Sequence, residues 1–385
     1  MSWTPPARPF EPQEYDHRFR QLRAALSLKS VDMYVVSKPE NLYYFSGFTP
    51  SSGGYYQQLF LPISANHAPI LLTHQIESEI ARETCGVREI RTYTHGDDPL
   101  AETLKILAEF GLEPGAVIGL ELANVYLGVN TYIHLSKRLG GFRLVDVSVD
   151  VDQLRFIKSK AEVDYLRRAA AVADAGMAAA IESLRPGMSE KDLNAIIQSA
   201  LWRAGTESPP FPTLIGSGPR SSLFHAFPTE RVIGQDDPVL VELMGVKALY
   251  AANMLRMLVC GKAAPLVKDL HEIVLEAFWA GFRKATVGTP LGAIDSATRD
   301  VRRDYASFIP GRAGFGVGIG YPPGDVGPSI LEGSPHVVSA GMVFSLEPSI
   351  AQYNGLTVIF GNCIHVTPEG PELLHKTQNQ LFEVT

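Results

Sequence analysis

Two helices joined by a glycine-containing turn occur twice in the second half of the chain, and this repeat constrains the fold most. In the first copy, Ser159 and Glu162 form a capping box, S-K-A-E, which predicts a long helix that ends near R-P-G at 185–187. Ser189 opens the next helix, in which apolar residues recur at helical spacing. The second copy has a helix over 265–284 and another that begins in V-G-T-P-L-G. Because strand-like sequence follows each copy, we predict two helical pairs packed on one sheet in a pseudo-symmetric domain.

The first part of the chain alternates helix-like and strand-like segments. Residues 14–26 form an amphipathic pattern, and a second helix is expected near 126–139. Short apolar runs bounded by Pro, Gly, Asn and Ser predict the strands V-D-M-Y-V-V-S, L-Y-Y-F-S-G-F, Q-L-F-L-P-I, A-P-I-L-L-T and A-V-I-G-L-E. We therefore expect an α/β (α+β) protein with two domains, residues 1–154 and 155–385.

Charge and composition exclude several classes of function. The net charge is −7, and the basic residues form no run of the kind that binds nucleic acid or an anionic membrane. No apolar stretch reaches the roughly 18 residues of a membrane span, and M-S-W-T-P-P lacks the apolar segment of a secretory signal. Three cysteines without C-x-x-C spacing indicate neither a disulfide framework nor a thiolate metal site. These features predict a cytoplasmic protein that binds neither nucleic acid nor membrane.

Several residues late in the chain are candidates for chemistry. The run G-F-G-V-G-I-G-Y-P-P over 314–323 allows close backbone approach to a pocket, but its prolines prevent the helix of a dinucleotide site. His225 lies in a loop rich in Gly, Ser and Pro, where an imidazole can give and take a proton near neutral pH. Glu242 and Glu347 are single acids in apolar strands, and a buried carboxylate needs a partner.

Three late segments, taken in order, resemble the pita-bread fold of the creatinase, aminopeptidase P and methionine aminopeptidase superfamily. They are L-V-E-L-M-G with Y-A-A-N-M-L-R-M-L-V-C-G at 240–261, the glycine run at 314–323, and V-F-S-L-E-P-S-I with G-N-C-I-H-V-T-P-E-G at 343–370. K-P-E-N-L-Y-Y-F-S-G-F is similar to the creatinase-type N-terminal domain. The resemblance covers essentially the whole chain and implies a creatinase-type α/β domain followed by a pita-bread catalytic domain.

The metallopeptidases of this superfamily hold two divalent ions with two Asp, one His and two Glu. The resemblance places the first Asp on Glu242 and the second on Asn253. It places the His on Phe315, the first Glu on Glu347 and the last Glu on Gly361. Because Phe and Gly offer no side-chain ligand and Asn only a neutral oxygen, this pattern predicts that the protein needs no metal and no other cofactor.

Among members without metal, the chain is most similar to creatinase and the ectoine hydrolases, the latter through G-I-G-Y-P-P. The catalytic histidine of creatinase-like enzymes falls on His225. The resemblance thus implies a metal-independent hydrolase of C–N bonds in a small nitrogen-rich substrate, amino-acid-like or carrying an amidine or guanidine. We expect His225 to be the general acid and base. Glu242 and Glu347 would clamp a cationic group, or one of them would act as base or nucleophile.

Further residues are predicted to contact the substrate. Asn253 and Phe315 replace metal ligands, so they would shape the pocket, together with Tyr321. Arg256 would bind a substrate carboxylate or else form a structural ion pair. In creatinase-like dimers the region of Tyr55 covers the active site of the partner, so a homodimer is expected with the partner's N-terminal domain near the site.

Two other functions are compatible with the same residues. One is a catalytically inactive binding protein that kept the fold after losing the metals. The other is a metal-dependent peptidase or lyase with one ion held by Glu242, Glu347 and Asn253. The sequence fixes neither the substrate nor whether the reaction is hydrolysis, ring opening or a non-hydrolytic step.

Overall fold

The chain divides into two compact units, Met1–Arg155 (unit 1) and Phe156–Thr385 (unit 2). The computed structural model describes residues 8–49, 55–63, 67–320 and 327–385. The predicted domain boundary, after residue 154, lies one residue before the end of unit 1, and the assignment of residues 1–154 and 155–385 as two domains stays a prediction. None of the described helices combines the length and the apolar character needed to cross a membrane.

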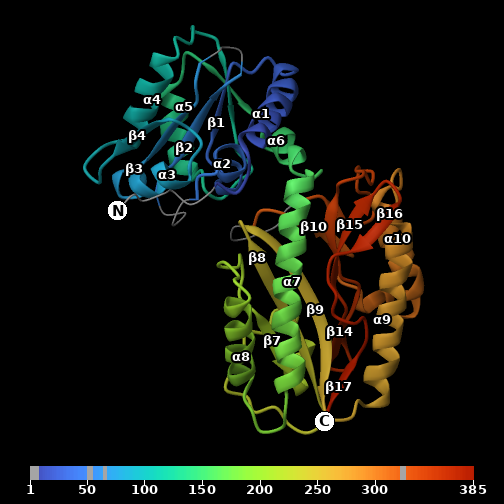
Figure 1. Ribbon diagram of the computed structural model, residues 1–385. Coiled ribbons are helices and arrows are strands. Elements are labelled where there is room, and N and C mark those ends of the chain that lie inside the picture. Colours follow the sequence, from blue (N-terminus) through green and yellow to red (C-terminus); the bar gives the residue numbers. More distant parts are fainter. Residues whose placement is uncertain (1–7, 50–54, 64–66, 321–326) are drawn as a thin grey trace. The chain divides into compact units, whose positions relative to one another are not determined.

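Unit 1 is built on a six-stranded sheet with helices around it (Figure 1). The strand order is β4-β3-β2-β1-β5-β6, in which β2 runs antiparallel to both of its neighbours and the other pairs are parallel. The strands are β1 (Met33–Val36), β2 (Gln58–Pro62), β3 (Ile70–His74), β4 (Glu89–Tyr93), β5 (Val117–Leu120) and β6 (Arg143–Asp146). The helices are α1 (Pro12–Ser27), α2 (Pro39–Ser46), the 3₁₀ helix η1 (Gln75–Glu77), α3 (Ser78–Thr84), α4 (Pro99–Glu109), α5 (Val129–Arg138) and α6 (Ser148–Leu154).

One predicted strand of unit 1 is wrong. The segment L-Y-Y-F-S-G-F lies mostly in helix α2, all of whose residues are buried. Pro39 occupies the first turn, where its missing N–H costs nothing, and Gly47 ends the helix with a φ of +76°. The aromatic residues favour a strand by propensity, but the Pro and Gly signals at the two ends decide for a helix.

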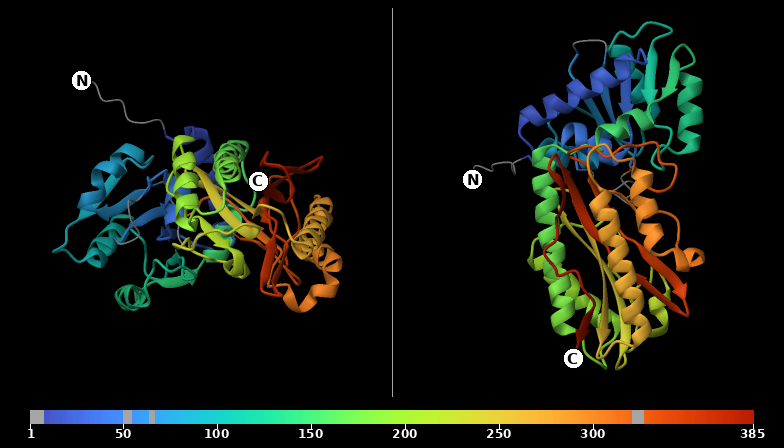
Figure 2. Two further views of the ribbon diagram at one scale, coloured as in Figure 1. Left: turned by 90° about the horizontal axis from the view of Figure 1, so that it is seen from below. Right: turned by 90° about the vertical axis from the view of Figure 1, so that its right-hand side faces the viewer.

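Unit 2 has helices on two sides and strands between them (Figures 1 and 2). The side chain of Ser159 accepts the predicted backbone hydrogen bond and Glu162 completes its capping box. Ser189, which was predicted only to open the next helix, forms a second capping box with Asp192. The helices are α7 (Lys160–Ser183), α8 (Glu190–Arg203), η2 (Gly218–Ser222), α9 (Pro265–Lys284), α10 (Leu291–Val301) and η3 (Arg303–Phe308). The predicted pair of helix–turn–helix units is therefore confirmed.

The strands of unit 2 form several ladders where one sheet was predicted. The sheets have the orders β17-β9-β8-β7 and β11-β10-β12-β15-β16, and β13 pairs with β14. Isolated bridges, such as Leu255 with Gly361, connect the ladders. The strands are β7 (Leu214–Ser217), β8 (Asp237–Lys247), β9 (Tyr250–Cys260), β10 (Gly314–Gly316), β11 (Ser329–Ile330), β12 (Val343–Leu346), β13 (Ser349–Tyr353), β14 (Leu356–Ile359), β15 (Asn362–Thr367), β16 (Gly370–Leu373) and β17 (Phe382–Val384).

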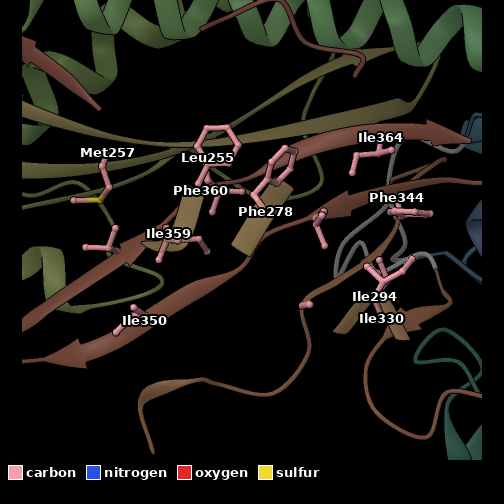
Figure 3. Packing of buried hydrophobic residues seen from close by; sticks show 14 of the residues in the cluster. Leu255, Met257, Phe278, Ile294, Ile330, Phe344, Ile350, Ile359, Phe360 and Ile364 are labelled. Atoms are coloured by element: carbon pink, nitrogen blue, oxygen red, sulfur yellow. The ribbon is translucent and has the colours of Figure 1, made fainter. Parts of the chain in front are cut away.

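Alternate residues of β8 and β9 point into two apolar clusters, as the period of a strand requires. Leu243 and Met254 pack with residues of α7 and α8. Leu255 and Met257 pack with residues of α9, α10 and the later strands (Figure 3). A Cβ at Gly245 would lie 2.0 Å from the carbonyl oxygen of Ala169, so only glycine lets α7 approach β8 this closely. The two long strands are thereby held between both helical layers, which fixes the side chains that they carry.

Candidate functional site

The fold brings three predicted site residues together from three strands. Glu242 lies on β8, Asn253 on the antiparallel neighbour β9, and Glu347 directly after β12. The side-chain nitrogen of Asn253 donates a hydrogen bond of 2.8 Å to Oε1 of Glu347. In the ladder, Glu242 is paired with Leu255 and Met244 with Asn253, so the two polar side chains belong to the same face of the sheet.

The two acids are electrostatically coupled. Glu242 is 7% exposed, and its burial raises its pKa well above the ordinary value for a glutamate. The negative charge of Glu347 raises the pKa of Glu242 further, because neighbouring carboxylates repel each other strongly where little water screens them. Glu242 therefore holds a proton at pH values at which an exposed glutamate has lost it, unless a cation takes the place of that proton.

Phe315 stands on β10 at a small pocket next to Asn253. The volume open to the centre of a water molecule in this pocket is about 10 Å³, which is enough for about one water. The guanidinium carbon of Arg312 lies 4.5 Å from the centre of the Phe315 ring. A Cβ at Gly314 would lie 2.1 Å from the carbonyl oxygen of Ser345, which explains why β10 begins with glycine. The pocket is lined by Pro210, Met244, Ala251, Asn253, Phe315, Gly316, Val317, Gly318 and Gly320.

Asn253 is supported from behind by residues that the sequence did not indicate as functional. Nε2 of the buried His375 lies 2.9 Å from the backbone carbonyl oxygen of Asn253. The thiol of Cys363 donates to the same carbonyl oxygen over 3.4 Å. Burial lowers the pKa of His375 to about 4, so this imidazole is neutral at pH 7 and serves to fix the strand. The two residues are 122 positions apart in the sequence, and no sequence pattern predicts their contact.

Arg256 is part of the protein interior. It is fully buried, its guanidinium carbon lies 4.3 Å from the ring centre of Phe360, and Nη1 donates 2.7 Å to the carbonyl oxygen of Gly361. Nη2 of Arg256 donates to the carbonyl oxygen of Thr377, and its Nε donates to that of Gln378. Burial lowers the pKa of Arg256 to about 9, which leaves it charged at neutral pH. A substrate carboxylate would have to displace these internal contacts.

His225, the predicted acid and base, lies exposed in the loop after η2. Its ring centre is 6.5 Å from that of Phe224, and the described contacts include no hydrogen bond between His225 and either acid. The loop is anchored by the buried Glu190, which accepts hydrogen bonds of 2.9 Å from the backbone of Ser217 and 3.0 Å from that of Thr229. The structure thus does not unite His225 with the pair of acids, and its catalytic role stays a prediction.

Two predicted residues lie elsewhere. Tyr55 belongs to unit 1, where its ring stacks on that of His74 with a centroid distance of 4.6 Å. Its place near a partner's active site stays a prediction. Tyr321 lies outside the described residues.

The residues present do not fit the two-ion centre of the superfamily. A Cβ at Gly361 would lie 2.4 Å from Cδ1 of Leu255, so the leucine fills the position from which the last glutamate ligand would project. By the resemblance of the glycine run, Phe315 takes the place of the histidine ligand, and its ring offers no ligand atom. Among the described residues, no group of three or more His, Cys, Asp or Glu side chains is placed to hold a metal ion. Ligands for a second ion are therefore missing in the described part of the chain.

A single hard cation is compatible with the remaining donors. Divalent ions such as Mg²⁺ are held in many proteins by one or two carboxylates, with further oxygens from substrate or water. Glu242 and Glu347 supply two carboxylates, and the nitrogen of the Asn253 amide donates to Glu347. The amide oxygen of Asn253 is the remaining neutral donor, and it accepts a weak hydrogen bond from the thiol of Cys363 over 3.5 Å. Burial and the charge of Glu347 raise the pKa of Glu242, so a cation bound here would take the place of the proton on that carboxyl group.

The chain matches known proteins over nearly its full length. The family model of the metallopeptidases of family M24 matches residues 164–368, and that of the creatinase/prolidase N-terminal domain matches residues 18–157. An Xaa-Pro dipeptidase of Pyrococcus furiosus is 28% identical over 367 residues, which cover 95% of this chain and 99% of the relative. The crystal structure of dipeptidase PepE from Mycobacterium ulcerans is similar, with a TM-score of 0.84, 26% identity, and 98% of this chain and 100% of that chain covered. A prolidase from Thermococcus sibiricus shares the fold with a TM-score of 0.86 at 23% identity, and 96% of this chain and 98% of that chain are covered.

These matches confirm the predicted fold and overturn the predicted reaction. A creatinase-type N-terminal domain followed by a catalytic domain of the pita-bread type is present, as expected. The relatives, however, are named Xaa-Pro dipeptidases, and the family model is that of metallopeptidases. The prediction of a metal-independent, creatinase-like hydrolase of non-peptide C–N bonds is therefore wrong. The pattern of lost ligands misled it, because ligand loss was equated with a change of substrate.

Proposed function

Because the chain belongs to metallopeptidase family M24, we propose that it hydrolyses the peptide bond of a short peptide of the Xaa-Pro type, with one divalent cation in the Glu242–Glu347 pocket. The observation that supports this most is the grouping of Glu242, Asn253 and Glu347 at three ligand positions of the family. A homodimer with a cytoplasmic location remains part of the proposal, drawn from the family resemblance alone.

The side chains around the cation have separate tasks. Glu242, Glu347 and the amide oxygen of Asn253 would hold the ion, which would supply Lewis acidity for the peptide carbonyl. Asn253 orients Glu347 through their 2.8 Å hydrogen bond, and His375 and Cys363 hold the backbone of Asn253 in place.

A second candidate, favoured by one specific observation, is a protein that binds such peptides without cleaving them. Leu255 fills the space beside Gly361, and Phe315 replaces a ligand, so the two-ion chemistry of the family lacks its ligands here. In this case the paired carboxylates would bind the ammonium group of the peptide by charge-assisted hydrogen bonds.

One experiment separates the two candidates. The purified protein is stripped with a chelator, reloaded with Mn²⁺, incubated with Ala-Pro, and assayed for free proline by mass spectrometry. If the protein hydrolyses Ala-Pro, proline is released only in the presence of Mn²⁺, and this release is lost in Glu347→Gln. Calorimetric binding of Ala-Pro without release of proline would establish the second candidate instead. Neither binding nor release, over a panel of Xaa-Pro dipeptides, would refute both.

A further inference from the structure

We propose that unit 1 carries a binding site for a small organic anion that bears a ring, in an open groove along α1. The groove encloses about 600 Å³, within the range of about 300–1,000 Å³ that is usual for small-molecule sites. Its walls come from Arg8, from α1, from Phe45 of α2 and from the segments 68–69 and 86–88, all within unit 1. The proposal does not rest on the peptidase function, since Glu242 and Glu347 belong to unit 2.

The groove has a strong positive charge. Four arginines line it, Arg8, Arg20, Arg23 and Arg88, and the only acid among its lining residues is Asp16. Four cations and one anion give the lining a formal charge of +3, on a chain whose net charge is −7. A local excess of this kind attracts anions by focusing the electrostatic potential into a concave surface.

The arginines are also not neutralised by the protein. In the parts of the chain that the structure describes, none of the four takes part in an ion pair within 4.0 Å. Nε of the half-buried Arg23 is itself buried and has no hydrogen-bond partner. A buried donor without an acceptor is unfavourable, and the oxygen of an anion would satisfy it.

The remaining walls define the rest of the ligand. The half-buried Phe19 lines the groove beside the arginines and packs edge-to-face on the buried Phe45, and Pro69 and Val87 add further apolar surface. Guanidinium groups match the oxygens of carboxylates and phosphates in pairs, and aromatic side chains stack on flat rings. The combination fits a ring that carries a carboxylate or a phosphate, whereas a fully hydrated inorganic anion would leave the aromatic wall unused.

Calorimetry with the full chain tests this site. Phenyl phosphate, benzoate and inorganic phosphate are titrated at low ionic strength and again in 0.3 M NaCl. We expect at least one of the two ring anions to bind five or more times more tightly than inorganic phosphate. The ring anion that binds more tightly shows whether the site prefers a phosphate or a carboxylate. Added salt should weaken binding, because salt screens exposed charges. Absence of binding by both ring anions at millimolar concentration, or equal binding of inorganic phosphate, overturns the proposal.

Matched variants locate the site. Arg23→Gln and Arg88→Gln should each weaken binding of the tighter ring anion about tenfold. Arg88 is exposed, so its variant folds even if Arg23→Gln does not. Arg82→Gln is the control, since Arg82 is an exposed arginine of α3 that pairs with Glu79 outside the groove. Equal weakening by Arg82→Gln, or none by Arg88→Gln and Arg23→Gln, would contradict the assignment.

Discussion

The acidic pocket of unit 2 and the basic groove of unit 1 differ in charge and in burial. In unit 2, Glu242 lies on β8 and Glu347 directly after β12, and burial together with the charge of Glu347 raises the pKa of Glu242. In unit 1, the arginines of the groove are exposed or half-buried. The difference shows that neighbouring like charges that are buried bind a proton or a counter-ion. Like charges at the surface remain hydrated until a ligand binds.

Replacing one arginine in each region should give the largest contrast. Arg256→Met in unit 2 removes the donors to the carbonyl oxygens at 255, 361, 377 and 378 and the contact with Phe360. We expect a loss of about 3 kcal/mol or more in the free energy of unfolding, because buried carbonyl groups lose their partners. Arg88→Met in unit 1 should change it by less than about 0.5 kcal/mol. Urea unfolding measures both, and similar losses would show that burial does not separate the two regions.

Neutralising one acid of the unit 2 pocket should have the next largest effect. Glu347→Gln keeps the shape of the side chain but removes one carboxylate and the charge that acts on Glu242. Release of proline from Ala-Pro should fall about a hundredfold or more. Glu369→Gln, an exposed acid of the same unit, is the control and should retain full activity. Unchanged turnover in Glu347→Gln would remove this residue from the chemistry.

The filled ligand position can be tested by a double-mutant cycle. Gly361→Ala places a methyl group 2.4 Å from Cδ1 of Leu255, and overpacking of this kind costs about 1–3 kcal/mol. In the background of Leu255→Ala the same change should cost clearly less, since the obstacle is gone. Additive losses in chemical denaturation would mean that Leu255 does not occupy this space.

The pH dependence of stability should show the smallest effect. The pKa of Glu242 is raised in the folded protein, so above about pH 4.5 the folded state holds a proton that the unfolded state releases. Stability therefore falls as the pH rises from about 4.5 towards the folded pKa. Glu242→Gln cannot ionise, so this variant should lose that slope and be more stable than the native protein above this window. The exposed Glu272→Gln should keep the native slope, and an unchanged slope in Glu242→Gln would argue against the coupling.

Local signals in the sequence predicted most of the fold. The capping boxes at Ser159 and Ser189 and the helix over 265–284 act through contacts a few residues apart, so the sequence shows them directly. Helix α2 was predicted as a strand because its aromatic residues favour strands and because Pro and Gly bound strands as well as helices. The division of the strands into several ladders depends on long-range pairing, which no local pattern encodes.

The candidate site was predictable only in part, for a related reason. Glu242, Asn253 and Glu347 were found through family motifs, and the structure brings them together. The contact between His375 and Asn253, and the fit of Leu255 against Gly361, arise from tertiary packing alone. The groove arginines come from separate segments, so the absence of a basic run in the sequence did not exclude a basic surface.

Titration of Mn²⁺ into the chelator-treated protein tests the central claim most directly. The account predicts one ion per chain, with release of a proton from Glu242 on binding and loss of binding in Glu347→Gln. Two ions per chain, or binding of one ion that persists in both Glu347→Gln and Glu242→Gln, would contradict it.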